Sequence, residues 1–501
     1  MSTLAARLRL AAAVAVTLAI VVPLGWMWWG SRLPSSYSMA SLGYVDGGGR
    51  PVETHGAHAG HAGTDVATLT GPPTGTPAVN VTLTARQEDI TLASGKVVKA
   101  GYTLNHTSPG PAIVARQGEL VQITLLNESV PGGVTLHWHG LDVPNAEDGV
   151  AGVTQDAVGP GQRHVYRFVP QRAGTYWYHS HQVADEQVRL GLYGSLVVTP
   201  RRPVSPAPDV DVTAPVHTYR GTRAVGGVPG QFPVQAKPGD LVRIRVIDTD
   251  DGSLRTWVAG ASYRLVALDG RDWHGPTPVT GRAVLIGAGG RADLEFTMPG
   301  DGAQVRVGVG GGTTSVLVSP PAGTGARPPA PPVTAPKDDL DLLTYGTPAD
   351  VGFDPQRPDR TFDYRIGRRP GFVDGKPGLW WSINGHLFPD VPMFQVSLGD
   401  VVRMRITNSS GQAHPMHLHG HHVLVLSHNG RPSTGSPWWT DTVPVKDGDT
   451  YVVAFVADNP GVWADHCHNL QHASQGLVTH LEYTGYTTHF RIGGKAGNTL
   501  G

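Results

Sequence analysis

The ten residues Ser397-Leu-Gly-Asp-Val-Val-Arg-Met-Arg-Ile join a turn to a run in which apolar and polar side chains alternate. Alternation with a period of two is typical of a half-buried β-strand. The arrangement recurs at Lys237-Pro-Gly-Asp-Leu-Val-Arg-Ile-Arg-Val, and a related one occurs at Gln117-Gly-Glu-Leu-Val-Gln-Ile-Thr-Leu. The copies lie about 120 to 160 residues apart, which is the length of a domain. We therefore expect three homologous β-sandwich domains.

The composition agrees with an all-β chain of several domains. Its 501 residues are too many for one ordinary domain. The 66 glycines and 42 prolines interrupt helices and suit a protein with many turns. A formal net charge of −1 gives no electrostatic reason to expect nucleic acid as a partner.

The N-terminal segment has the pattern of a membrane or export signal. Arg7 and Arg9 precede an apolar run from Leu10 to about Gly30, which is long enough to span a bilayer. The run ends in tryptophans that suit the membrane–water interface. A cleavage site at Ser38-Met-Ala would instead release a signal peptide. An uncleaved anchor and a cleaved signal both remain open; either exports the rest of the chain, to the extracellular face of the membrane or as a secreted protein.

Pro-rich and weakly apolar stretches suggest the domain boundaries. Residues 41–76 read as a flexible stalk, and its His55, His58 and His61 form either a polar linker or a weak copper-collecting tract. The expected division is a signal peptide or anchor over 1–40, the stalk over 41–76, sandwich domains over 77–200, 201–336 and 337–491, and a tail over 492–501.

Four histidine clusters carry the chemistry: His137-Trp-His-Gly, His179-Ser-His, His414-Pro-Met-His-Leu-His-Gly and His466-Cys-His-Asn-Leu-Gln-His. Residues i and i+2 of a strand face the same side, so each His-x-His pair directs two imidazoles to one point. Three such pairs with His417 and His419 supply eight imidazoles. Imidazole suits copper, zinc, iron and nickel. Eight are too many for one ion but suit a cluster of two or three.

The only cysteine, Cys467, narrows the choice of metal. It lies between His466 and His468, so on a strand its side chain points to the opposite face. There it can join His414 and His472. Two histidines and one cysteine with a weak axial group make a blue-copper electron-transfer site. Structural zinc sites instead use closed sets of four ligands, which this cysteine-poor chain does not supply.

With these four motifs, the sequence resembles the three-domain multicopper oxidases of the laccase type across roughly residues 76–490. The resemblance implies three consecutive cupredoxin-like Greek-key sandwiches and four copper ions, with a trinuclear cluster between the first and third domains. It implies type 1 ligands His414, Cys467 and His472, type 2 ligands His137 and His417, and type 3 ligands His139, His179, His181, His419, His466 and His468. The second domain, which has no such motif, would be a spacer.

Two further positions follow from the resemblance. Leu477 stands where many relatives have an axial methionine; leucine cannot coordinate, so we expect a raised reduction potential. Asp148 resembles the acidic residue near the cluster and is a candidate proton relay, the alternative being a turn residue before glycine. The acid that many relatives carry near His472 is replaced by Ala473, and Asp465 is a possible substitute.

The implied activity is one-electron oxidation of a small reductant, coupled to four-electron reduction of dioxygen to water. A phenolic or aromatic donor is favoured because the seven methionines do not cluster, as they often do in metal-handling relatives. The alternatives are a cuprous or other metal-ion oxidase in copper tolerance, and a copper-binding protein without turnover. Donor selection is expected near His472 and in residues 433–439, where Trp438 and Trp439 either stack a donor or cap the core. We expect a monomer.

Overall fold

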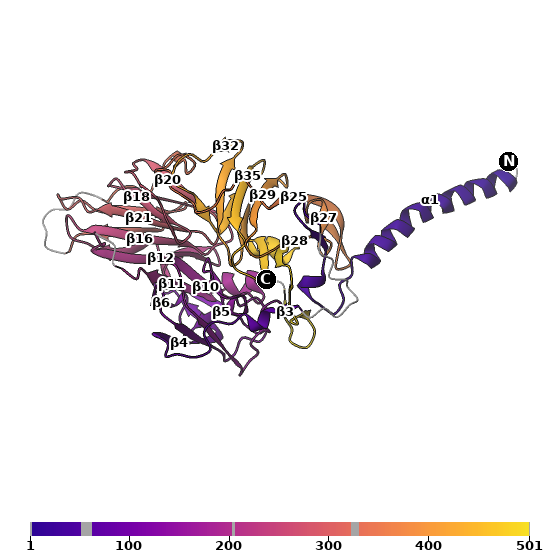
Figure 1. Cartoon of the computed structure of the whole chain (residues 1–501), viewed down its shortest axis with the longest axis horizontal. Coiled ribbons are helices and arrows are strands. Elements are labelled where there is room, and N and C mark those ends of the chain that lie inside the picture. The colour runs from indigo at the N-terminus through magenta and orange to yellow at the C-terminus, as the bar shows by residue number, and fades with distance from the viewer. Residues whose placement is uncertain (1–2, 52–62, 203–205, 322–329, 500–501) are drawn as a thin grey trace.

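The computed structural model describes residues 3–51, 63–202, 206–321 and 330–499. These residues form mostly β-strands, arranged in three consecutive groups, with one long helix that projects from the body (Figure 1). The fold is therefore all-β, as predicted. Each group contains two main sheets.

The first group lies in the lower part of Figure 1. One sheet has the order β5-β4-β7-β9 and the other β6-β11-β10-β8. The strands are β4 Val79–Thr91, β5 Val97–Leu104, β6 Gly110–Arg116, β7 Val121–Asn127, β8 His137–His139, β9 Arg163–Phe168, β10 Gly174–His179 and β11 Tyr193–Thr199. A short helix, α2 (Ala184–Arg189), precedes β11.

The second group forms sheets of order β14-β13-β12-β16-β21-β18-β19 and β15-β23-β22-β17-β20-β24. Its strands are β12 Val210–Tyr219, β13 Thr222–Val225, β14 Val228–Pro229, β15 Gln231–Gln235, β16 Leu241–Asp248, β17 Leu254–Ala259, β18 Arg264–Leu268, β19 Arg271–Asp272, β20 Arg282–Ile286, β21 Arg291–Thr297, β22 Val305–Val309, β23 Ser315–Ser319 and β24 Asp338–Asp339.

The third group forms one sheet of order β2-β28-β37-β36-β30-β34, and a second built from β25 to β27, β29, β31 to β33 and β35. The strands are β25 Arg360–Val373, β26 Lys376–Ile383, β27 His386–Leu387, β28 Pro392–Val396, β29 Val401–Asn408, β30 His414–Leu418, β31 Val423–His428, β32 Arg431–Pro432, β33 Trp439–Thr440, β34 Thr442–Val445, β35 Thr450–Val456, β36 Val462–Cys467 and β37 Val478–Tyr483. Helix α3 (Leu470–Ser474) joins the last two.

The three repeated segments occupy equivalent places. They form β7, β16 and β29, and each pairs parallel with the first long strand of its group and antiparallel with a later one. Alternate residues of β7 are buried, and the same residues pack against the facing sheet. The repeat thus marks the same interior strand of three similar sandwiches, and the alternating pattern gives each of these strands one core-facing side.

Within the segment 41–76, which was expected to be a flexible stalk, two described stretches are paired in β-sheets. β2 (Tyr44–Asp46) pairs with β28, and β3 (Thr64–Asp65) pairs with β38 (Tyr486–Thr487). Backbone pairing with the third group holds these residues in place. His55, His58 and His61 lie outside the described residues.

The expected tail is also paired. β39 (Ile492–Gly493) forms a two-stranded sheet with β1 (Ser36–Tyr37). Asn498 accepts a hydrogen bond from the backbone of Ala157, and Thr499 contacts Gln182. The described C-terminal residues therefore join the first and third groups.

Helix α1 (Thr3–Gly30) is the one helix of the described residues that is long and apolar enough to cross a membrane. Its span Ala5–Gly30 has a mean hydropathy of 2.2, and none of it is buried in the protein. It projects from the side of the body where β25 and β27 lie (Figure 1).

Candidate metal centres

The four histidine clusters meet where the first and third strand groups face each other. In the first group β8 pairs with β10, so His137 lies opposite His179. In the third group β30 pairs with β36, so His417 lies opposite His466. In β8 both histidines of the motif lie within the strand. In the other three motifs the second histidine lies just past the end of its strand; these are His181, His419 and His468. Strand ends thus supply eight imidazoles to one buried space.

The inner nitrogen atoms of these imidazoles face one another. The Nε2 atoms of His137 and His417 are 3.4 Å apart. The Nε2 atom of His466 lies 3.3 Å from that of His181 and 3.1 Å from that of His419. On the other side, the rings of His139 and His468 have centroids 4.7 Å apart, and His179 borders both. The histidines therefore lie in adjoining groups that overlap at His137 and His419.

Most of the outer nitrogen atoms are held by oxygen acceptors. Nδ1 faces a backbone carbonyl in four of the histidines, and His419 Nδ1 lies 3.0 Å from Asp148 Oδ2; the four are His137, His179, His417 and His466. An N–H that donates outward leaves the inner nitrogen with its lone pair free. This orientation by a second hydrogen bond is the usual arrangement of metal-binding histidines.

Burial keeps seven of these imidazoles neutral. It lowers the pKa well below the ordinary histidine value in His139, His179, His181, His417, His419 and His468, and to about 4 in His466. Neighbouring histidines lower the pKa further, because two positive rings would repel each other. Neutral imidazole is the form that binds metal ions.

Cys467 lies on the opposite face of β36 from His466, as its position in the strand predicts. Its Sγ atom is 3.5 Å from His414 Nδ1 and 3.8 Å from His472 Nδ1, and the two nitrogens are 3.2 Å apart. Donors around one ion, with metal bonds of about 2.0 Å to nitrogen and about 2.3 Å to sulfur, lie roughly 3.5 to 3.8 Å apart in a trigonal plane. The three atoms have nearly this spacing.

The thiol site is dry and supported from behind. Burial raises the pKa of the Cys467 thiol above its usual range, while a hydrogen bond from the Asn469 backbone acts in the opposite direction. A bound cation would therefore be needed to hold the thiolate. His414 Nε2 lies 2.7 Å from Ser410 Oγ, which leaves its Nδ1 free toward the sulfur. His472 is on α3, whose first turn is capped by the Asn469 side chain.

Leu477 is fully buried and belongs to the same apolar core as Cys467. Its carbonyl accepts a hydrogen bond from the Cys467 backbone. It offers no side-chain donor, so the prediction of a site without an axial ligand stays consistent with the packing.

Trp381 forms the wall of the thiol site. Its ring lies 4.7 Å from the His414 ring and 4.4 Å from the His472 ring. The guanidinium of Arg368 stacks on the Trp381 ring at 4.5 Å. The tryptophans expected near the donor site are elsewhere: Trp438 packs against Tyr451, and Trp439 contacts Phe353 and Arg271. Trp381 follows Trp380 in β26, and this pair of tryptophans matches no motif that would have marked the position in the sequence.

Asp148 lies at the histidine cluster and not on a surface turn. It is 1% exposed, with Oδ2 3.0 Å from His419 Nδ1 and Oδ1 3.1 Å from His137 Nδ1. One carboxylate thus contacts an imidazole from each side of the cluster. Its role as a proton relay stays a prediction.

Asp465, the possible second relay acid, faces away from the cluster. It alternates with His466 along β36, so it shares the face of Cys467 and lies against Tyr364. Burial raises its pKa to about 8. Its position beside Tyr364 does not suit the role that Ala473 leaves open.

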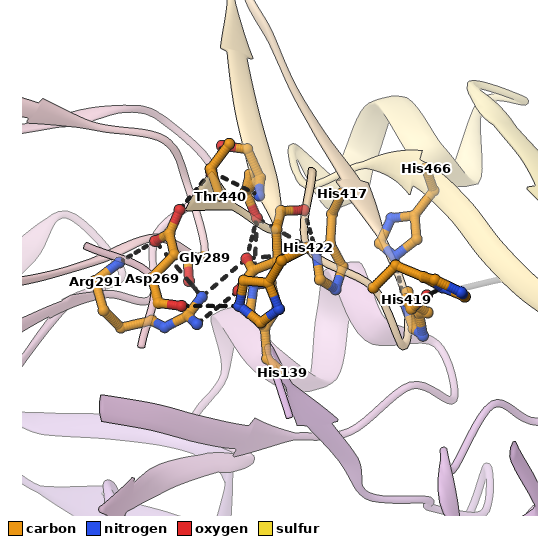
Figure 2. A network of polar contacts seen from close by, with 12 residues as sticks. His139, Asp269, Gly289, Arg291, His417, His419, His422, Thr440 and His466 are labelled. Atoms are coloured by element: carbon orange, nitrogen blue, oxygen red, sulfur yellow. Dashed lines mark hydrogen bonds and ion pairs between the residues drawn. The ribbon is translucent and has the colours of Figure 1, made fainter. Parts of the chain in front are cut away.

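An ion pair that no sequence motif indicates connects the second strand group to the cluster. Arg291, at the start of β21, donates to both carboxylate oxygens of Asp441 at 2.9 and 2.6 Å, and both side chains are fully buried. Asp441 Oδ1 lies 3.2 Å from His139 Nε2, and its carbonyl lies 2.9 Å from His417 Nδ1. Figure 2 shows Arg291 and Asp269 on one side of His139, with His417, His419 and His466 on the other.

Two glycines make room for this network. A Cβ at Gly140, which has φ +80°, would lie 2.1 Å from Arg291 Nη2. A Cβ at Gly289, with φ +81°, would lie 2.7 Å from the His139 ring. Glycine is required at both positions by the close approach and by the backbone conformation. The second group is therefore more than a spacer: it positions a ligand candidate of the first.

His421 and His422, which follow the third histidine motif, are both buried, and each has a polar partner. His421 Nε2 lies 2.7 Å from the Tyr483 hydroxyl. His422 Nε2 lies 2.9 Å from the Asp269 carbonyl and 3.5 Å from Asp441, so it belongs to the network around Arg291. Neither joins the donor groups.

The donor sets fit copper. One cysteine and two histidines in a buried plane suit a blue-copper site, and imidazoles in adjoining sets suit a cluster. His414, Cys467 and His472 have donor atoms within 4.8 Å of one another, as do three overlapping sets of cluster histidines. One tripeptide, His466-Cys467-His468, contributes to both places.

Comparison with known proteins agrees with a copper-binding role for these donor sets. Two sequence profiles described as multicopper oxidase match residues 85–203 and 355–484. Multicopper oxidase MmcO of Mycobacterium tuberculosis (strain ATCC 25618 / H37Rv) is 28% identical, over 91% of this chain and 95% of that protein. Laccase-1 of Botryotinia fuckeliana is 27% identical, over 78% and 80%.

Solved structures show the same fold. A multi-copper oxidase from Pseudomonas thermotolerans superposes with a TM-score of 0.65 at 27% identity, covering 82% of this chain and 100% of that one. Fet3p, described as a multicopper oxidase that functions in iron import, has a TM-score of 0.69 at 19% identity, covering 81% and 90%. At that identity the likeness concerns the fold alone.

Fold, donor sets and relatives together define an oxidoreductase that contains copper and uses dioxygen. The chain belongs to the laccase-like multicopper oxidase family.

Proposed function

We propose that the protein oxidises a small phenolic or aromatic reductant in one-electron steps at the Cys467 site and reduces dioxygen to water at the histidine cluster. It would hold four copper ions: type 1 on His414, Cys467 and His472, type 2 on His137 and His417, and a type 3 pair on the remaining six cluster histidines. The observation that carries the proposal is the tripeptide 466–468, which supplies donor atoms to both sites.

Copper ions, when bound, accept single electrons at the thiolate and supply the reducing equivalents for dioxygen at the cluster. The chain prepares both places. It keeps seven of the cluster imidazoles neutral, orients their rings by hydrogen bonds and buries Cys467 completely. Asp148 supplies a carboxylate where four protons are consumed per dioxygen, which supports its predicted role as a relay.

A small apolar cavity reaches the cluster. It has a volume of about 20 Å³ and is bordered by His181 and His466, together with Val150, Val153 and Val478. Apolar cavities stay dry and accept apolar gases. Dioxygen is such a molecule, so this cavity supports dioxygen as the oxidant.

Charge at the donor side favours an organic reductant. Arg368 lies over Trp381. Burial lowers the pKa of His472 to about 4, and the positive charge of Arg368 makes a smaller contribution in the same direction. The same charge repels a cationic donor such as cuprous ion and attracts a phenolate. The aromatic face of Trp381 adds a surface on which a ring could stack.

A metal-ion donor is the second candidate, because a carboxylate lies near the thiol site. Asp251 is close enough to raise the pKa of Cys467. Its carboxylate accepts a hydrogen bond from the Leu470 backbone at the start of α3. That bond gives Asp251 a structural reason to be there, so the arrangement favours the organic donor.

We further propose that the chain is exported and held at the outer face of the membrane by α1, and that it acts as a monomer. The hydropathy of α1 supports the first point. The second is supported by the single chain, whose first and third strand groups supply both sides of the cluster.

The test is oxygen uptake by the copper-loaded protein with a phenolic donor and, separately, with cuprous ion. Cys467→Ser should remove uptake with either donor. Arg368→Glu should lower kcat/KM for an anionic phenol several-fold and raise it for cuprous ion. Arg369→Glu is the matched control, because Arg369 points to the other face of β25 and donates to the Gly385 carbonyl.

Uptake with the phenol that responds to Arg368 and not to Arg369 supports the proposal. Uptake with cuprous ion alone would show a metal oxidase. A fully loaded blue protein that consumes no oxygen with either donor would refute the oxidase function.

A further inference from the structure

The ends of β25 and β26 form a ribbon that extends beyond its sheet. β25 pairs with β29 only from Arg360 to Ile366, and β26 pairs with β27 only at Ser382 and Ile383. Between these pairings and the tip, described residues 367–381 pair only with each other. A two-stranded ribbon is marginally stable in water unless one face is covered.

One face of this ribbon is apolar, and it leads to the thiol site. The cross-strand pairs Arg368–Trp381, Pro370–Leu379 and Phe372–Pro377 follow one another at every second residue of the ribbon. Residues two apart on a strand point to the same side, so all three pairs share one face. Leu379 is 53% exposed, and Pro370 and Pro377 beside it are exposed too, so the apolar side chains form a continuous patch. We call Pro370, Phe372, Pro377 and Leu379 the hairpin face. At its inner end, Trp381 contacts His414 and His472.

The tip of the ribbon touches the end of the apolar helix. Gly375 donates from its backbone N–H to Ser31 Oγ at 3.1 Å, and Leu33 donates to Asp374 Oδ1 at 3.3 Å. A Cβ at Gly375 would lie 3.2 Å from the indole nitrogen of Trp28. Trp26 and Trp29 at this end of α1 are strongly exposed. Tryptophans at the end of a spanning helix lie at the membrane–water interface, so the tip of the ribbon must lie there too.

Basic side chains surround the hairpin face. Arg368, Arg369 and Lys376 are exposed on the ribbon, and Arg32 follows α1 and stacks on Trp28. The one acidic residue at the tip, Asp374, is bonded to the backbone of Leu33. Basic groups around an apolar patch match a bilayer that contains anionic lipid.

We propose that the hairpin face lies on the outer face of the membrane that α1 spans, and that the thiol site takes its electrons from an amphiphilic hydroquinone dissolved in that membrane. This rests on the proposed oxidase function and names its donor. From Lys376 to Trp381 is five residues, or about 17 Å of strand, so the donor site lies near the bilayer. Two hydroquinones give up four electrons and four protons and become two quinones. One dioxygen takes up the four electrons and the four protons and becomes two waters.

The experiment uses the full-length, copper-loaded protein in vesicles of phosphatidylcholine and phosphatidylglycerol. Oxygen uptake is measured with a water-soluble hydroquinone and with a long-chain alkyl hydroquinone placed in the vesicles. Backbone hydrogen exchange of residues 368–380 is measured in vesicles and in detergent. The variants are Leu379→Glu and Leu398→Glu.

Leu398 is a matched control. It is 62% exposed and lies in the turn before β29. β29 pairs with the opposite end of β25 from the tip, about 40 Å along the strand.

We expect exchange at residues 368–380 to slow in vesicles. Leu379→Glu should reduce oxidation of the vesicle-bound donor about tenfold and leave that of the soluble donor within twofold, and Leu398→Glu should change neither. Equal effects of the two variants, or exchange that does not depend on lipid, would overturn the proposal. So would exchange already slowed in detergent at high protein concentration, since a second copy would then cover the face. No uptake with either donor, but lipid-dependent exchange, would refute the oxidase function and its donor while leaving the membrane contact.

Discussion

Arg291 lies where a single side chain links the second strand group to the cluster. Its fully buried guanidinium is paired with Asp441 and lies 3.6 Å from Asp269. Removing one partner of a buried ion pair leaves an unpaired buried charge and typically costs about 3–5 kcal/mol. We therefore expect Arg291→Met to lower the thermal midpoint of the copper-free protein markedly, and to loosen His139 through Asp441.

The control is Arg264→Met in the same sheet. Arg264 pairs with Glu295 at 2.7 Å, but its side chain is 43% exposed, so the loss should stay below about 1 kcal/mol. Copper content after loading provides the second readout: Arg291→Met should lose cluster copper and keep the blue thiolate band. Equal midpoints for the two variants would show that the buried pair contributes little.

Leu477 is the residue through which the potential of the thiol site can be tested. We expect Leu477→Met to lower the reduction potential, because the thioether adds a weak axial donor that stabilises the oxidised ion. Each 59 mV of decrease makes electron uptake about tenfold less favourable. The potential is read by redox titration of the visible band. Leu477→Ile conserves volume without adding a donor, and it should leave the potential almost unchanged; a fall in this variant would point to packing.

At the scale of strands, the sequence predicted the features that depend on neighbouring residues alone, namely the alternating strands and the paired histidines. The alternating residues of β7, β16 and β29 and the paired histidines of β8 carry their signal within a few residues. The ribbon of β25 and β26 was not foreseen, because Arg368-Arg-Pro-Gly-Phe reads as a loop. Trp381 was not foreseen either, since its contact with His472 joins residues far apart in the sequence.

The strand β37 carries a titratable group that should make stability depend on pH. Glu482 is 9% exposed, and burial raises its pKa from 4.5 to about 7. Between these values the folded state holds a proton that the unfolded state has lost, so stability falls as pH rises from about 4.5 to about 7. The difference in pKa corresponds to at most about 3 kcal/mol.

Glu482→Gln removes this titration. The variant should unfold at a higher temperature than the parent at pH 8 and at nearly the same temperature at pH 4.5. Thermal midpoints of the copper-free proteins across this range provide the measurement. A gap between the two proteins that does not change with pH would mean that the carboxyl of Glu482 is not the source.

At the scale of the whole molecule, the sequence predicted which histidines come together with Cys467, but not which side chains support them. The histidine motifs are short and repeated, whereas Arg291 and Asp441 are 150 residues apart and neither has a motif. Their pairing depends on how the second and third groups pack. A sequence read in segments therefore assigns the second group no part in the site, and only the assembled chain shows that it holds Asp441 against His139.

One chain also supplies both halves of the cluster, which predicts how activity depends on concentration. His137 and His139 come from the first group and His417 and His419 from the third, and donor atoms from both groups lie within 4.8 Å of one another in the same chain. Oxygen uptake per chain should therefore stay constant when the detergent-solubilised, copper-loaded protein is diluted a hundredfold. A site completed by a neighbouring chain would lose activity on dilution by mass action. Sedimentation of the same samples should show one copy at every concentration, and a loss of both size and uptake on dilution would contradict the monomer.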